Sequence, residues 1–186
     1  MCKSILKTEI SLRSLKLEDA EPMLEWMTNP DIYKKMQFDG KNQTLEKCQK
    51  FIQHSWNDKK NLHYAITNSS EEYLGTVSLK NIDEENCNAE FAIVIMPSVM
   101  GKGIALVAMQ KILEKAFYEL GLSKVYLYVR NDNERAVKFY RKNQIRQEGC
   151  FRKHLFVDEE FKDVFWFAML KDEYVGWLES VFNVSL

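Results

Sequence analysis

The sequence predicts an α+β domain built on a mixed β-sheet. In its first half, two strand patterns are joined by a short polar turn, and the second half alternates strand and helix before it closes with two strands. Hairpin links join antiparallel strands, whereas a helix between strands allows parallel pairing. With 186 residues the chain can bury one substantial core, so we expect a single domain over residues 1–186.

The first half predicts three strands and two helices. Residues 10–15 alternate as in a strand, and residues 17–27 follow as a helix with acids in the first turn. Residues 31–43 are expected to be irregular. Thr44 can cap a second helix that reaches Trp56. Apolar runs at 62–66 and 73–79 predict a strand pair across a polar turn.

The second half predicts a strand, a long helix, a strand, a capped helix and a closing hairpin. The long helix runs from the glycines near residue 103 to Leu120, because its apolar residues recur at helical spacing. Asn133 provides an N-cap for the next helix, and an aromatic tail from Asp172 predicts a short last helix. The remaining strands are expected at 89–95, 125–130, 149–157 and 161–170.

The composition is that of an ordinary soluble protein, with 46% hydrophobic residues, 28% charged residues and a net charge of −1. A nucleic-acid-binding protein would show a clustered basic excess, so we expect no nucleic-acid partner. No apolar run approaches the roughly 20 residues that span a bilayer, and we expect no membrane partner. The first nine residues lack the apolar core of a secretory signal.

The cysteines and histidines are scattered rather than grouped as metal ligands. The four cysteines contain no closely spaced pair, and the three histidines are equally dispersed. We therefore expect no metal. Free thiols without a secretory signal predict a cytoplasmic protein.

The segment that organises the chain is the glycine turn between the apolar run 91–95 and the long helix. It reads Gly101-Lys102-Gly103-Ile104-Ala105. The first N–H groups of a helix lack partners inside the helix, and its dipole places partial positive charge there, so this turn is a candidate anion site. The alternative is a tight turn without a ligand.

Two well-known phosphate motifs do not fit this turn. The Walker loop requires Lys-Ser/Thr after its last glycine, but Ile104 and Ala105 stand there. The dinucleotide fingerprint requires a third glycine where this chain has Leu106.

The turn resembles the acetyl-CoA motif of the GNAT superfamily of N-acetyltransferases, Arg/Gln-x-x-Gly-x-Gly/Ala. Gly103 and Ala105 match the motif, and Met100 replaces its Arg or Gln. The resemblance implies a three-layer fold in which helices flank a mixed, mostly antiparallel sheet of about seven strands. It also implies acetyl-CoA as cosubstrate, held by Met100, Gly101, Lys102, Gly103, Ile104 and Ala105.

A second motif extends the resemblance over nearly the whole chain. The family carries Asn-x-x-Ala followed by Tyr, and this chain has Asn133, Ala136 and Tyr140, which helical spacing places on one face. The resemblance implies that Tyr140 protonates the leaving sulfur and that Asn133 binds CoA, caps its helix, or both. A packing role for Tyr140 is the alternative. Gln144 and Ile145 replace the family's Gly-Phe pair, so the turn after this helix is expected to differ.

Glu90 is the single charge inside the strand 89–95 and lies on the face opposite its apolar residues. A carboxylate in an apolar sheet is a candidate general base, direct or through water. A structural pair with a Lys or Arg is the alternative. By resemblance, the strands separate near Ile95, where a main-chain N–H meets the oxyanion and the Ile93–Ile95 backbone pairs with pantetheine.

The opening of the chain resembles the branch of GNATs that acetylates ribosomal-protein alanine, spermidine or 4-amino sugars. In that branch the segment between the first two helices helps to choose the acceptor, and here it holds Tyr33, Lys34, Lys35 and Phe38. Lysines beside aromatics favour an anionic acceptor that can stack, such as an amino-sugar nucleotide. The alternatives are a peptide N-terminus, a polyamine, and a non-catalytic acyl-CoA-binding module. Homodimer formation stays open.

Overall fold

The computed structural model describes residues 10–36 and 39–182. Its strands are β1 (Ser11–Ser14), β2 (Leu62–Thr67), β3 (Tyr73–Asp83), β4 (Asn88–Ile95), β5 (Lys124–Arg130), β6 (Arg146–Val157) and β7 (Glu160–Leu170). Its α-helices are α2 (Ala20–Met27), α3 (Pro30–Tyr33), α4 (Leu45–Ser55), α5 (Ile104–Glu114), α6 (Glu134–Lys142) and α7 (Lys171–Phe182). Three short helical turns accompany them: η1 (Leu17–Asp19) precedes α2, η2 (Pro97–Val99) precedes α5, and η3 (Lys115–Glu119) follows α5.

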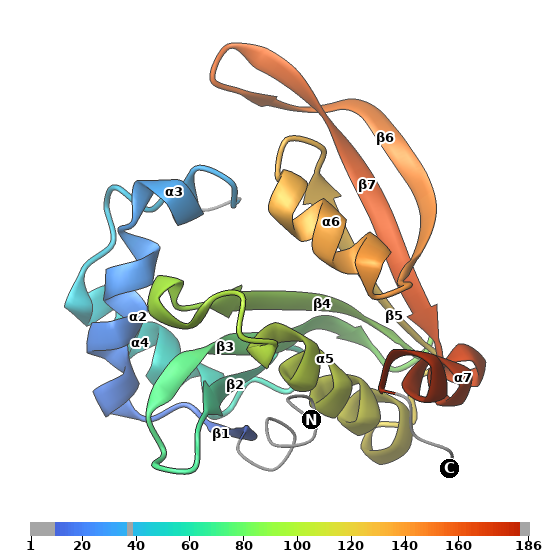
Figure 1. Cartoon of the computed structure of the whole chain (residues 1–186). Coiled ribbons are helices and arrows are strands. Elements are labelled where there is room, and N and C mark those ends of the chain that lie inside the picture. Colours follow the sequence, from blue (N-terminus) through green and yellow to red (C-terminus); the bar gives the residue numbers. More distant parts are fainter. Residues whose placement is uncertain (1–9, 37–38, 183–186) are drawn as a thin grey trace.

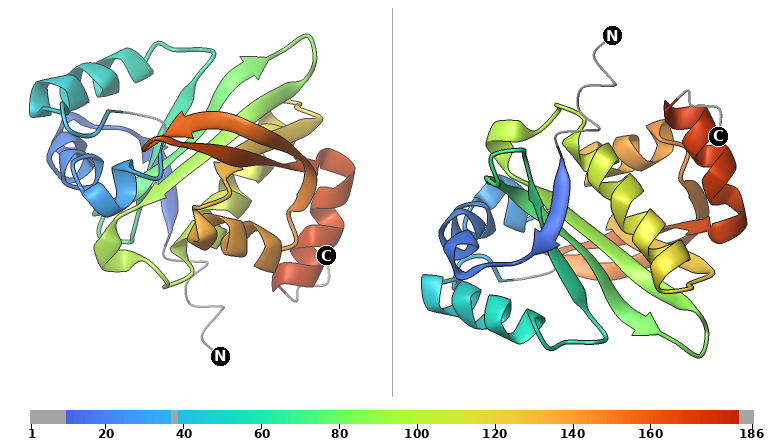
Figure 2. Two further views of the ribbon diagram at one scale, coloured as in Figure 1. Left: turned by 90° about the horizontal axis from the view of Figure 1, so that it is seen from above. Right: turned by 90° about the horizontal axis from the view of Figure 1, so that it is seen from below.

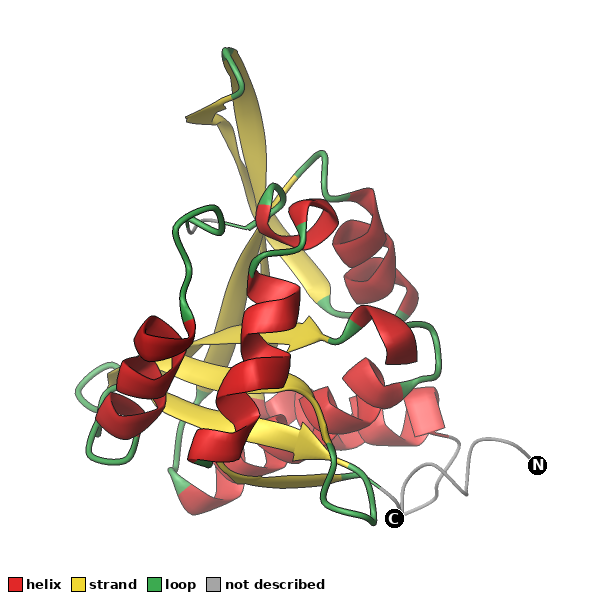
Figure 3. Cartoon of the chain, turned by 90° about the vertical axis from the view of Figure 1, so that its left-hand side faces the viewer, coloured by secondary structure: helices red, strands yellow, loops and turns green. Residues whose placement is uncertain are grey.

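The strands form one seven-stranded sheet in the order β1-β2-β3-β4-β5-β7-β6. Neighbouring strands are antiparallel except β4 and β5, which are parallel because α5 returns the chain between them. Figure 3 shows the β6–β7 hairpin projecting beyond the rest of the sheet. The predicted mixed, mostly antiparallel sheet is confirmed.

Helices cover the two faces of the sheet and make three layers (Figures 1 and 2). At the β1–β3 end, α2 and α4 bury Met23, Cys48 and Ile52 against Ala65. On the other face, α5 buries its apolar side against β1, β3 and β4. The last helix, α7, is tied to α5 by the Tyr174 hydroxyl, which donates to the Gln110 main-chain oxygen at 3.0 Å.

Most predicted elements appear with boundaries within a few residues. Three differ. A short helix, α3, lies in the segment expected to be irregular, and the helix predicted to reach Leu120 changes to the wider helical turn η3 after Glu114. The tail helix α7, which was expected to be short, has 12 residues. Gln144 adopts a left-handed φ of 59°, so the turn after α6 keeps a conformation that glycine prefers. Phe38 lies outside the described residues.

The feature that positions the site is the separation of β4 from β5. These strands pair only from Asn88↔Lys124 to Glu90↔Tyr126, after which β4 continues to Ile95 with no β5 partner. On the other side of β4, β3 stays close, since a Cβ added to Gly75 would lie 2.2 Å from the Val94 main-chain oxygen. Because only the β5 side of this part of β4 lacks a neighbouring strand, the sheet opens between β4 and β5.

Among the described residues, no helix is long and apolar enough to cross a membrane.

Candidate active site

The opening between β4 and β5 leaves main-chain groups available in the middle of the sheet. Beyond Glu90, the edge of β4 that faces β5 has no strand to pair with. Ile93 is partly exposed there and Ile95 is buried. An extended ligand can hydrogen-bond to such an edge as an added strand. The predicted contact of Ile93 and Ile95 with the pantetheine arm fits this geometry and stays a prediction.

The glycine turn lies just beyond the end of β4. Gly101 and Gly103 have φ of 80° and 83°, a left-handed conformation that glycine adopts at little cost. Gly103 is the N-cap of α5 and no side chain caps that helix, so its first N–H groups point into the turn. A Cβ added to Gly101 would meet no other described atom within 4 Å. Exposed donors, open space and the helix dipole fit the diphosphate of acetyl-CoA.

Tyr140 reaches the opening from α6. Its ring is buried between the rings of Phe91, Phe139 and Phe167, whose centroids lie 6.5, 5.3 and 5.6 Å away. Burial raises the pKa of the Tyr140 hydroxyl above that of a free phenol. The hydroxyl has no hydrogen-bond partner within residues 10–36 and 39–182. The buried phenol therefore keeps its proton, and its role as proton donor stays a prediction.

Asn133 acts at least as a helix cap. Its side-chain oxygen accepts a hydrogen bond from the Ala136 N–H at 3.4 Å at the start of α6. The parallel direction of β4 and β5 brings the starts of α5 and α6 to the same end of the sheet. Arg135 of α6 consequently contacts Met100, the last residue before the glycine turn.

Glu90 is buried, but it is paired. Its two oxygens meet Lys80 Nζ at 2.5 Å and Asn81 Nδ2 at 2.9 Å. The sequence left open whether Glu90 is a lone carboxylate or an ion-pair partner, and the structure forms the pair. Because Glu90 and Tyr126 are the last pair of the β4–β5 ladder, the carboxylate still lies where the strands separate.

An aromatic cluster beside Glu90 was missed by the sequence analysis. Tyr126 and Tyr128 of β5 lie 4.5 and 6.0 Å from Trp166 of β7, with interplanar angles of 13° and 22°. Phe151 of β6 contacts the same indole edge-on at 5.6 Å. Burial, followed by the charge of Glu90, raises the pKa of both tyrosines. We call these four residues the aromatic cluster; it lies on the sheet face opposite α5.

The predicted acceptor segment lies over the carboxyl end of β5. Tyr33 ends α3 and is partly exposed, and Lys34 and Lys35 after it are exposed. Arg130, buried at the end of β5, donates to the Lys34 main-chain oxygen at 2.8 Å and is held by Asp132 at 2.6 Å. The segment is therefore fixed to the strand that carries Tyr126 and Tyr128.

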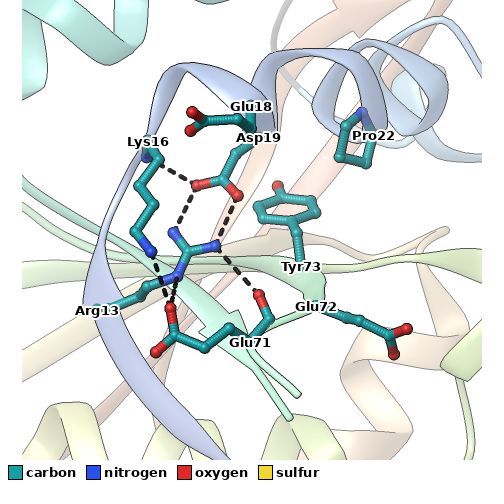
Figure 4. A pocket seen from close by; sticks show the side chains of 8 residues that line it. All are labelled: Arg13, Lys16, Glu18, Asp19, Pro22, Glu71, Glu72 and Tyr73. Carbon is teal, nitrogen blue, oxygen red and sulfur yellow. Dashed lines mark hydrogen bonds and ion pairs between the residues drawn. The ribbon is translucent and has the colours of Figure 1, made fainter. Parts of the chain in front are cut away.

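A separate pocket lies at the β1 edge of the sheet (Figure 4). Arg13 is held there by the Asp19 carboxylate at 2.7 and 2.8 Å, and Lys16 meets Glu71 at 2.8 Å. These ion pairs tie β1 to η1 and to the turn between β2 and β3. The pocket is a structural junction, distant in the strand order from the central opening.

No three His, Cys, Asp or Glu side chains gather as a metal site within the described ranges. The three cysteines described there, Cys48, Cys87 and Cys150, are free thiols.

Comparisons with known proteins agree with this geometry. Residues 9–146 match the family model of the acetyltransferase (GNAT) domain. The putative ribosomal N-acetyltransferase YdaF of Bacillus subtilis is 29% identical, over 94% of this chain and 97% of its own. The spermidine N(1)-acetyltransferase of Vibrio cholerae is 24% identical, over 92% and 98%.

Among solved structures, the spermidine N-acetyltransferase from Vibrio cholerae in complex with CoA and spermine superposes with a TM-score of 0.82. It is 24% identical to this chain, and the match covers 90% of this chain and 98% of that one. The glycine turn, the open strands and the family model all lead to one conclusion: the chain belongs to the GNAT acetyltransferases and is an acetyl-CoA-dependent N-acetyltransferase.

Proposed function

We propose that this N-acetyltransferase acts on a small molecule whose primary amine is carried on a ring, with an amino-sugar nucleotide as the type of acceptor. The observation that carries the proposal is the aromatic cluster beside the opening, on the face opposite α5 and α6. Aromatic side chains bind flat rings and sugar faces through extensive apolar contact.

The charges around the aromatic cluster support a ring-bearing acceptor over a polycation. Glu90 is paired with Lys80, and Asp132 is paired with Arg130. A polyamine would require unpaired carboxylates, because each ammonium group must recover the interactions that it loses with water. The exposed Lys34 and Lys35 add positive charge close by, which attracts an anionic acceptor.

In the proposed reaction, Tyr140 donates its proton to the sulfur that leaves. In water a phenol is a weaker acid than a thiol by about 1.5 pKa units, so the transfer would be uphill. The pocket of Phe91, Phe139 and Phe167 raises the pKa of Tyr140. Apolar surroundings also disfavour a thiolate anion, so a sulfur that leaves beside Tyr140 is a stronger base than in water, which offsets the raised pKa of the phenol.

Glu90 is proposed to accept the proton of the amine through water. Its carboxylate lies at the start of the opening, on the acceptor face, and Lys80 and Asn81 hold it in one position. Since these two partners already occupy its oxygens, water is a better link to the amine than direct contact. The acetyl carbonyl is polarised by a main-chain N–H of β4 near Ile95.

The experiment that tests this function measures the release of CoA thiol from acetyl-CoA with three acceptor classes offered separately. The classes are 4-amino-sugar nucleotides, spermidine with spermine, and peptides with a free N-terminal Ala or Ser. We expect turnover with the amino-sugar nucleotides. Turnover restricted to another class overturns the acceptor proposal but leaves the acetyltransferase assignment in place.

Spermidine is the second candidate acceptor. The observation that favours it is the similarity to the Vibrio cholerae spermidine N(1)-acetyltransferase over nearly the full length of both chains. Changing both Lys34 and Lys35 to Gln separates the two candidates. Removing these charges weakens the binding of an anionic nucleotide sugar and strengthens the binding of a polyamine.

A further inference from the structure

Arg135 connects the two helices that begin at the open end of the sheet. It occupies the second position of α6, and its Nη1 lies 2.7 Å from the Sδ atom of Met100, 35 residues earlier in the chain. Met100 immediately precedes Gly101, so the Arg135 guanidinium lies beside the glycine turn at the start of α5.

The charge of Arg135 is not neutralised by the protein. Within the described residues no carboxylate pairs with it, whereas Arg130 and Arg13 are held by Asp132 and Asp19. The neighbouring acid, Glu134, pairs instead with Lys138. A thioether is neutral and only a weak acceptor, so the contact with Met100 leaves the guanidinium free for an anion.

The glycine turn itself contributes backbone donors and one exposed lysine, Lys102. Met100 has no donor that could contact a phosphate. Arg135 adds a guanidinium beside the same turn, with N–H donors in the forked arrangement that binds phosphate oxygens.

We propose that Arg135 binds the diphosphate of acetyl-CoA and so supplies from α6 the side-chain contact that Met100 does not supply. The diphosphate then lies between the α5 N-terminus and the Arg135 guanidinium. This inference depends on acetyl-CoA as cosubstrate and is independent of which amine is acetylated.

Direct binding tests the inference without an acceptor. Calorimetry measures the Kd of CoA for the wild type and for Arg135→Gln, and an NMR titration measures the weak binding of S-acetylpantetheine, which lacks the diphosphate. We expect Arg135→Gln to raise the Kd of CoA about tenfold, the effect of one lost charge-assisted contact, and to leave the Kd of S-acetylpantetheine unchanged. Lys142→Gln, an equal charge change at the far end of α6, is the matched control.

A rescue variant completes the test. Adding Met100→Arg to Arg135→Gln restores a guanidinium beside the turn, because residues 100 and 135 are in contact, and we expect it to restore most of the affinity for CoA. An unchanged Kd of CoA in Arg135→Gln overturns the inference. An equal loss of affinity for CoA and S-acetylpantetheine overturns it as well, because that result indicates a structural role for Arg135. Both results stand whichever amine is the acceptor.

Discussion

Arg130 fixes the acceptor segment to the sheet: its Nη1 donates to the main-chain oxygen of Lys34 at 2.8 Å, across 96 positions of the sequence. Asp132 holds the same guanidinium at 2.6 Å, and Arg130 is only 6% exposed. A buried arginine with these partners determines where the chain after α3 lies. Lys34 and Lys35 thereby keep a fixed position relative to the aromatic cluster.

We therefore expect Arg130→Met to raise the KM for the accepted amine about tenfold, the effect of one lost charge-assisted hydrogen bond. The KM for acetyl-CoA should stay within about twofold, because the glycine turn is untouched. Steady-state kinetics with each substrate varied in turn measure the two values. Arg146→Gln, an exposed arginine with only a 3.8 Å contact to Glu173, is the control. Equal changes in both KM values would indicate a general loss of structure instead.

Tyr140→Phe removes the hydroxyl and keeps the ring that packs against Phe91 and Phe167. We expect turnover to fall by about 10²–10⁴-fold, the usual contribution of a positioned proton donor, with the Kd of acetyl-CoA unchanged. Calorimetry and thiol release measure the two effects. Tyr118→Phe, at a 57% exposed position, should change neither. Wild-type turnover in Tyr140→Phe would reduce Tyr140 to a packing residue.

The pH dependence provides a second check on Tyr140. Burial raises its pKa, so the phenol keeps its proton throughout the range in which an ordinary tyrosine, with a pKa of about 10, begins to ionise. The wild type should therefore show no loss of kcat from phenol ionisation up to about pH 10. A decline near pH 9 that is absent in Tyr140→Phe would mean that the pocket lowers the pKa.

The elements around the opening could be predicted because their signals are local. Gly103 adopts the left-handed conformation that ends the turn and begins α5, and the Asn133 side chain caps α6. Such short-range patterns predicted the strand that carries Glu90, the turn before α5 and the helix that carries Tyr140, and all three elements form. The short helix α3 also had a local signal, since Asn29 accepts from the Asp31 N–H and Pro30 occupies the first helical position. We did not use this signal and predicted an irregular segment at residues 31–43 instead.

The aromatic cluster, on the sheet face where we propose that the acceptor binds, could not be predicted from the sequence, because it depends on the order of the strands in the sheet. Trp166 lies opposite Tyr128 only because β7 inserts between β5 and β6. The alternation in β5 places Tyr126 and Tyr128 on one face, but it does not reveal what the neighbouring strand contributes. The Glu90–Lys80 pair likewise follows from the register of β3 on β4. The contact between Arg135 and Met100 requires the parallel β4–β5 pair.

Glu90→Gln tests the proposed base. The amide cannot accept the proton of the amine, so we expect kcat/KM to fall at least about 10²-fold. Lys80→Met, which keeps the carboxylate but removes its 2.5 Å partner, is the comparison and should retain activity. Steady-state kinetics and urea unfolding measure activity and stability of both variants. If both variants lose stability equally and keep wild-type kcat/KM, the pair is structural only.

His63 makes folding stability sensitive to acid. Its Nδ1 lies 2.7 Å from the Ser78 hydroxyl and its ring is 4.8 Å from the ring of Phe51. Burial lowers the pKa of His63 from 6.5 to about 4. The unfolded chain therefore binds a proton at a higher pH than the folded chain does, and acid favours unfolding. The stabilisation present above pH 6.5 is lost as the pH falls toward 4.

We expect the wild type to lose about 2–3 kcal/mol of unfolding free energy through His63 alone between pH 6.5 and 4. Urea unfolding at several pH values measures the total loss, to which carboxylates contribute as well. The difference between the wild type and His63→Gln isolates the histidine, because Gln can hydrogen-bond to Ser78 without titrating. His54→Gln, at a side chain 82% exposed, should follow the wild type. Parallel curves for the wild type and His63→Gln would mean that His63 gains its proton without cost in the folded chain.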